Sequence, residues 1–172
     1  MIVRLRVVLV ALVFLLGASP MSHGQSDDPV AKRFVGMWTQ SSWTEKLMDG
    51  TTRQNPLSVA HLIYTDNGRM CYVSMAPNRS AWTSAAAPSE AEALSGMGNR
   101  AFYAYCATVE VHAKEGFVLH HVDIDKIPNV VGRTRKRWFT FATPNKLVLR
   151  IDDTELAAPV VESTLVWERV ER

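Results

Sequence analysis

An alternation of apolar and polar residues with period two, repeated many times after residue 35, constrains this chain more than any other feature. Successive side chains of a β-strand point to opposite faces, so such alternation predicts strands with one buried face. The eight runs that carry it span residues 36–45, 59–65, 69–75, 101–112, 117–124, 133–142, 146–151 and 160–170. Turn residues separate the runs, most clearly Asp66, Asn67 and Gly68. The chain is therefore predicted to be mostly β.

Two short helices are expected beside the strands. Residues 30–34 suit a single helical turn, and residues 88–97 form the better candidate, with Pro88 near the start and Gly96 and Gly98 at the end. Eight antiparallel strands with this helix between the third and fourth fit a closed up-and-down barrel, which can hold one small ligand. A two-sheet sandwich would give a similar pattern, but polar and basic residues on the expected inner faces favour the barrel.

The first 24 residues have the layout of a secretory signal. Arg4 and Arg6 precede an apolar run over residues 7–16, which is short for a bilayer span, and small residues follow it. Ser22 and Gly24 suit cleavage before residue 25, so residues 25–172 are expected to form one exported domain. We predict a secreted or periplasmic protein with no stable membrane insertion after cleavage. The alternative is that the segment is retained as an anchor.

Charge and cysteine content narrow the classes of partner and site. The net charge of +2 is accounted for by Arg4 and Arg6, so the expected exported domain is balanced and no nucleic-acid partner is predicted. Cys71 and Cys106 both lie in that domain, where an oxidising compartment allows a disulfide; two buried free thiols are the alternative.

Neither a metal nor a cofactor is predicted. His120 and His121 are neighbours on one expected strand and point in opposite directions, so they cannot share an ion without a bulge. No nucleophile elbow or glycine-rich phosphate loop is present in the sequence.

Several segments, in order along the chain, resemble those of the compact lipocalin-like domain family of bacteria and fungi. They are Gly36-Met37-Trp38, Leu62-Ile63-Tyr64-Thr65 with Gly68 and Met70, Tyr105 with Glu110-Val111, His120-His121-Val122, Pro128-Asn129 with Val131-Gly132, Arg137, and Leu165-Val166-Trp167-Glu168-Arg169-Val170. The sequence departs from the family pattern at Cys106 and in the basic set Arg133, Arg135 and Lys136.

The resemblance implies a calycin-type barrel with a central cavity for small apolar molecules. It also implies a structural contact in which Arg169, on the closing strand, packs over Trp38 as a cation on an aromatic ring. The alternative for Arg169 is an exposed residue near the C-terminus.

The strand faces predict which side chains point into the barrel. With a two-residue turn at Glu115-Gly116, Val111 lies opposite His120. The expected inner face then carries Tyr103, Tyr105, Val109, Val111, Val118, His120, Val122 and Ile124, and the outer face carries Glu110, His112, His121 and Asp123. For His120, a hydrogen-bonded core residue without a ligand is the alternative to a cavity residue.

On the next strand, Arg135 and Arg137 share a face with Phe139 and Phe141, which suggests that this face is the interior. A buried guanidinium needs an anion or a carbonyl partner. We hypothesise that Arg137, with Tyr105 and His120, holds the carboxylate or another oxygen-bearing head group of a hydrophobic ligand. The alternatives are that the arginines face solvent with Trp138 inside, or that Glu110 or Asp123 pairs with Arg137 internally.

The leading functional interpretation is an exported binding protein for a small hydrophobic molecule. Its candidate binding residues are Trp38, Tyr64, Tyr72, Tyr105, His120 and Arg137. A second interpretation is an isomerase, cyclase or hydrolase acting on an apolar substrate, with His120 as acid or base and Tyr105 or Arg137 stabilising charge. A third is an envelope interaction module without a ligand, to which an exposed Trp43 or Trp82 would point.

Overall fold

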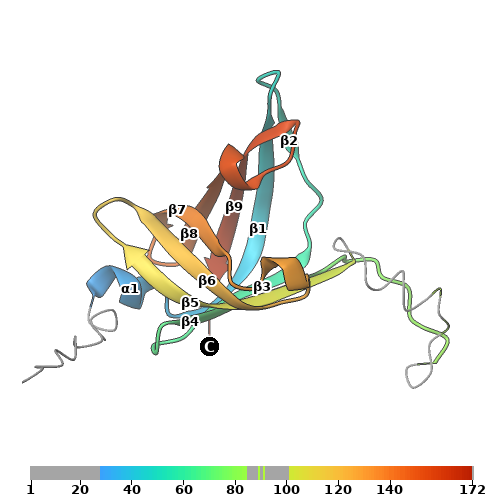
Figure 1. The fold of residues 1–172 in the computed structure, drawn as a ribbon, viewed down its shortest axis with the longest axis horizontal. Coiled ribbons are helices and arrows are strands. Elements are labelled where there is room, and N and C mark those ends of the chain that lie inside the picture. Colours follow the sequence, from blue (N-terminus) through green and yellow to red (C-terminus); the bar gives the residue numbers. More distant parts are fainter. Residues whose placement is uncertain (1–27, 85–88, 90, 92–100, 172) are drawn as a thin grey trace, which may run out of the picture.

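Strands dominate the computed structural model, which describes residues 28–84, 89, 91 and 101–171 (Figure 1). The elements in chain order are helix α1 (Pro29–Phe34), strands β1 (Gly36–Leu47), β2 (Thr52–Gln54), β3 (Val59–Tyr64), β4 (Arg69–Met75), β5 (Phe102–His112) and β6 (Phe117–Asp125), the 3-10 turn η1 (Pro128–Val130), strands β7 (Thr134–Thr143) and β8 (Lys146–Asp152), the 3-10 turn η2 (Asp153–Glu155) and strand β9 (Val160–Arg169). Each of the eight expected strands is present, with ends displaced by no more than two residues.

The strands close into a barrel because β1 pairs with β3 over residues 36–39 and with β9 along most of its length. All neighbours are antiparallel, and β1 with β3–β9 forms a closed barrel of eight strands within the described part of the chain. Closure leaves no sheet edge between the first and last strands, which a sandwich would have. The extra strand β2, which the sequence did not predict, turns back after Gly50 and pairs with the end of β1.

The helical turn expected over residues 30–34 is α1. Pro29 occupies its start, and the Asp28 carboxylate caps it by accepting a hydrogen bond from the N–H of Val30 at 2.7 Å. The helix expected over residues 88–97 falls almost entirely outside the described residues, as does the expected signal over residues 1–24. Both remain predictions.

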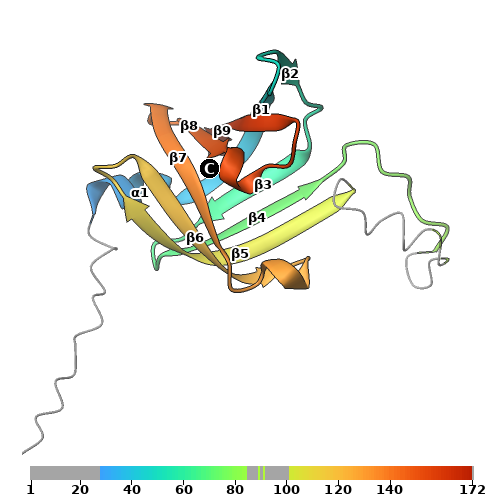
Figure 2. The same ribbon diagram turned by 45° about the horizontal axis from the view of Figure 1, so that its top comes forward.

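Helix α1 closes one end of the barrel with an aromatic plug. The Phe34 ring lies 5.0 Å from that of Tyr64 and 4.9 Å from those of Phe139 and Phe141, measured between centroids. The Trp38 indole N–H donates to the Phe34 carbonyl at 2.8 Å, which fixes the helix to β1. The β1–β2 turn and the β8–β9 connection lie away from α1, at the other end of the barrel (Figures 1 and 2).

Arg169 joins the last strand to the first. Its guanidinium lies 4.0 Å from the centroid of the Trp38 ring and donates to the carbonyls of Val35 and Arg33, both at 2.6 Å. The cation–ring contact that the family resemblance implied is therefore present. The Arg169 guanidinium fits because residue 36 is glycine. A Cβ on Gly36 would lie 2.6 Å from Nη1 of Arg169, and the φ of +131° also disfavours any side chain.

We predict that Gly36→Ala lowers the free energy of unfolding by at least about 2 kcal/mol, because it combines backbone strain with a clash. Gly116→Ala is the matched control, since Gly116 has a φ of +78° but no atom near its absent Cβ. The control should cost only about 1 kcal/mol. Urea unfolding of both variants measures the difference, and equal losses would contradict the role given to Arg169.

Cys71 and Cys106 form a disulfide. They occupy directly opposed positions on β4 and β5, with their Cα atoms 4.1 Å apart. Their neighbours Met70, Tyr105 and Ala107 are buried inside the barrel, so the alternating cysteines lie on its outer face. The bond links two strands that are already paired through their backbones.

The disulfide closes a loop with a sequence separation of 35, so we predict that Cys71→Ser with Cys106→Ser lowers the free energy of unfolding by about 3–4 kcal/mol. Chemical unfolding of the double variant, compared with the oxidised wild type, measures this loss. An unchanged unfolding midpoint would contradict it.

The β5–β6 hairpin differs from prediction in its register. His120 lies opposite Val109, not Val111, because residues 113–116 form a four-residue turn instead of a two-residue one. A slip of two residues leaves every side chain on its predicted face, so His120 still points inward. The prediction that Ile124 also points inward is wrong, since Asp123 is an extra residue on β6 and this bulge turns Ile124 outward with 60% exposure.

A second bulge lies in β1. Gln40 pairs with Trp167 and Ser42 with Val166, so Ser41 is an extra residue on β1. Trp38 and Trp43 would point to opposite faces of a regular strand, but the bulge turns both toward the interior. Trp43 therefore lines the cavity described below and is not the exposed surface residue that an interaction module would need.

Candidate functional site

The barrel contains a partly open cavity of about 210 Å³, here called the inner cavity. Its lining residues are Trp43, Glu45, Leu62, Tyr72, Tyr103, Tyr105, Arg135, Arg137, Leu149, Ile151, Leu156, Ser163, Leu165 and Trp167. An outer pocket of about 520 Å³ adjoins it and shares Trp43, Glu45, Tyr72, Tyr103 and Arg135. The wall is mostly aliphatic and aromatic, with a few polar groups, as in small-molecule sites generally.

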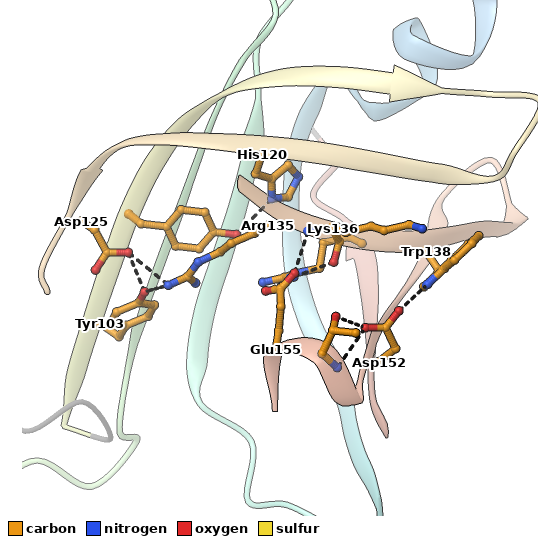
Figure 3. A network of polar contacts seen from close by, with 11 residues as sticks. Tyr103, His120, Asp125, Arg135, Lys136, Trp138, Asp152 and Glu155 are labelled. Atoms are coloured by element: carbon orange, nitrogen blue, oxygen red, sulfur yellow. Dashed lines mark hydrogen bonds and ion pairs between the residues drawn. The ribbon is translucent and has the colours of Figure 1, made fainter. Parts of the chain in front are cut away.

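Arg135 points into the barrel from β7 and is held by a buried acid. Its Nη2 donates to the Tyr103 hydroxyl and to Oδ2 of Asp125, the latter at 3.2 Å (Figure 3). The Asp125 side chain is fully buried, and the Tyr103 hydroxyl donates to it at 2.7 Å. The guanidinium also lies 4.5 Å from the centroid of the Tyr105 ring. The bulge at Asp123 in β6 turns Asp125 inward.

Arg137 also points inward, and its partner comes from the β8–β9 connection. Its Nη1 donates to Oε2 of Glu155 at 2.7 Å and to the Lys136 carbonyl at 2.6 Å. The second Glu155 oxygen, Oε1, accepts the Lys136 backbone N–H at 2.7 Å (Figure 3). The interior position predicted for Arg137 is therefore observed, and Trp138 faces outward, where its indole donates to Asp152 at 3.0 Å.

The internal partners considered for Arg137 were incorrect. Glu110 lies on the outer face with His112 and His121, at 2.8 and 3.1 Å, and Asp123 pairs with Arg69 at 2.6 Å. Glu155 was missed because it lies in a loop, where no periodicity indicates which way a side chain points.

The third charged residue of the cavity wall is Glu45. It is buried and accepts hydrogen bonds from Nε and Nη2 of Arg53, at 2.8 and 2.6 Å. Strand β2 positions Arg53 beside it. Each of the three charged lining residues thus has an ionic partner within the described part of the chain.

His120 lies between the inner cavity and the packed core near α1, in a chain of three polar side chains. Its Nε2 and the Tyr64 hydroxyl are 2.9 Å apart, and its Nδ1 and the Tyr105 hydroxyl are 3.1 Å apart. Burial, with added repulsion from Arg137 and Arg135, lowers the pKa of His120 well below 6.5, so the ring is neutral. A neutral imidazole has one donor and one acceptor, so it donates to one tyrosine and accepts from the other.

The structure divides the candidate binding residues into two groups. Tyr72, Tyr105 and Arg137 line the inner cavity. Trp38, Tyr64 and His120 are buried in the packed core between the cavity and α1, with exposures of 0–3%. The other cavity residues, none of which was among the candidate binding residues, are Trp43, Glu45, Leu62, Tyr103, Arg135, Leu149, Ile151, Leu156, Ser163, Leu165 and Trp167.

The described residues hold no group of three or more His, Cys, Asp or Glu side chains arranged for a metal ion. Within the same residues, no helix combines the length and the apolar character needed to cross a membrane.

A closed antiparallel barrel with one plugged end and a mostly apolar internal cavity defines a class of protein whose fold suits small-molecule binding. The sequence profile of a lipocalin-like domain matches residues 35–170, and the chain belongs to this lipocalin-like domain family. Among solved structures, it is similar to a redesigned β-barrel, with 11% identity and a TM-score of 0.41 over 81% of this chain and 94% of that one. No protein of curated function matches the chain.

The lowered pKa of His120 predicts a pH dependence of stability. As the pH falls through about 6.5, His120 binds a proton in the unfolded chain but stays neutral in the folded chain. The stability that comes from the neutral, buried His120 is therefore present above about pH 6.5 and is lost as the pH falls below it. The expected contribution is up to about 1.4 kcal/mol per pH unit. Urea unfolding between about pH 7 and pH 5 measures it.

His120→Gln should remove this contribution, since Gln can also donate once and accept once between two hydroxyls. An equal pH dependence in His120→Gln and the wild type would contradict the neutral, buried assignment.

Proposed function

We propose that the protein is exported and binds a small hydrophobic molecule in the inner cavity, with an oxygen-bearing head group directed to Arg137. The observation that carries this proposal is the convergence of Arg135, Arg137 and Tyr105 on a cavity whose remaining wall is mostly apolar. An apolar wall favours a hydrophobic ligand body, because burial releases it from water. Few polar groups among many apolar ones orient a ligand.

The position of Arg137 supports its role toward a head group. Its side chain is only 8% exposed, and both of its hydrogen bonds within the described residues start from Nη1. Nη2 and Nε are therefore left to donate to an oxygen in the cavity. A guanidinium in a mostly apolar site is a strong donor to such an oxygen, since little water competes there.

The enzyme interpretation finds less support. His120 uses both ring nitrogens in contacts with tyrosine hydroxyls and does not line the inner cavity. A general acid or base must lie within hydrogen-bond reach of the reacting atom. The interaction module rests on Trp82 alone, which is 40% exposed, because Trp43 points inward.

Export is supported by two independent observations. The first 24 residues carry the charged, apolar and small segments of a secretory signal. The disulfide between Cys71 and Cys106 is of the kind that persists in oxidising compartments. Mass spectrometry of the protein from its native host under non-reducing conditions would report the cleavage, the disulfide and a retained ligand together.

Filling the cavity should abolish binding. Leu165 lines the inner cavity opposite Leu149, and we predict that Leu165→Trp weakens the binding of methyl octanoate by at least about tenfold, because the larger ring occupies the ligand's space. Ile63→Trp is the matched control on the outer face, where Ile63 is 36% exposed. Titration calorimetry measures both, and equal affinities in the two variants would contradict a site inside the barrel.

A further inference from the structure

The chain places a carboxylate of its own on the arginine of the inner cavity. Leu156, in the connection between β8 and β9, lines the cavity, and its neighbour Glu155 reaches toward β7 (Figure 3). One Glu155 oxygen accepts from Arg137 and the other accepts from the Lys136 backbone N–H, both at 2.7 Å. Each oxygen of the Glu155 carboxylate thus has its own donor, one a guanidinium and one a backbone N–H. The same two donors could hold the carboxylate of a ligand.

This contact completes the charge balance of the cavity wall. Glu155 neutralises Arg137 as Asp125 neutralises Arg135. Arg53 neutralises Glu45, so no charge on the wall is left for an ionised ligand to match. A ligand carboxylate would add an unmatched negative charge close to Glu155, or would have to expel Glu155 from its two donors. Either event is unfavourable beside an ion pair whose side chains are only 8% and 24% exposed.

A neutral oxygen acceptor meets neither obstacle. It leaves the pair between Arg137 and Glu155 intact and accepts from Nη2 or Nε of Arg137, which have no partner among the described residues. Rejection of an alternative ligand by a repulsive group is a common source of specificity.

We propose that Glu155 determines the ligand specificity of the inner cavity. Its carboxylate occupies the position that a ligand carboxylate would take on Arg137, so the protein binds apolar molecules with an uncharged oxygen acceptor, such as an ester or a ketone, and discriminates against ionised acids. This inference rests on the proposed function and narrows the head group that the function left open.

The experiment compares two probes of equal acyl length, methyl octanoate and octanoate, by titration calorimetry on the oxidised protein at neutral pH. The wild type should bind the ester at least about tenfold more tightly than the acid. Glu155→Gln removes the negative charge and preserves the shape of the side chain. It should tighten octanoate binding at least about tenfold and change ester binding by less than about threefold.

Glu162→Gln is the matched control. Glu162 lies on β9, is 38% exposed in its side chain, pairs with Arg150 at 3.2 Å and does not itself line the cavity. The Glu162→Gln substitution removes the same unit of charge as Glu155→Gln, but outside the cavity. Both probes should therefore bind to this variant as they do to the wild type. Adding Arg137→Met to Glu155→Gln should abolish the gain for octanoate, which locates that gain at Arg137.

Two results would overturn the proposal: octanoate binding to the wild type as tightly as the ester, or no gain for octanoate in either Glu155→Gln or Glu155→Ala. The alanine variant is included because glutamine can keep one hydrogen bond to the Lys136 N–H. Melting curves establish that each variant is folded. Failure of both probes to bind any folded variant would contradict the proposed function itself. Binding with a preference for the acid over the ester would contradict only the role of Glu155.

Discussion

Charged side chains inside the barrel need oppositely charged side chains of the same chain beside them. This requirement shapes the fold around the cavity. An unpaired buried charge costs several kcal/mol, on the order of the stability of a whole domain. Three irregular features each supply one partner: the β6 bulge turns Asp125 toward Arg135, the β8–β9 connection brings Glu155 to Arg137, and β2 brings Arg53 to Glu45. Three departures from a regular eight-stranded barrel thus each supply a counter-charge to the interior.

The two ends of the barrel have different roles. At the end covered by α1, Phe34 packs among aromatic rings, and Arg169 ties the last strand to the first over Trp38. The other end keeps the cavity and the outer pocket. His120 lies between the two regions, where its contacts with Tyr64 and Tyr105 satisfy polar atoms that would otherwise be buried without partners. The packed end thus supports Tyr105, whose hydroxyl contacts His120 and whose ring lines the cavity.

The sequence predicted the strands well because alternation and turn residues are local signals. It also placed Arg135, Arg137 and His120 inside, since faces survive a register slip of two residues. It did not predict that Trp43 and Asp125 point inward, because each follows a bulge and no residue type marks a bulge in advance. The partner of Arg137 was missed for a related reason: Glu155 is near Arg137 in space only once β7 and β8 have paired.

The central claim is that a small, uncharged, mostly apolar molecule lies inside the barrel, against a wall whose charges are already paired. Isotope-filtered NMR on the labelled protein with unlabelled methyl octanoate tests it most directly, because intermolecular NOEs report which protons touch the ligand. The account predicts NOEs to the methyl groups of Leu149 and Leu165 and to the Tyr72 ring. NOEs confined to outer-face methyl groups such as those of Ile63 and Val59, or none at saturating ligand, would contradict it.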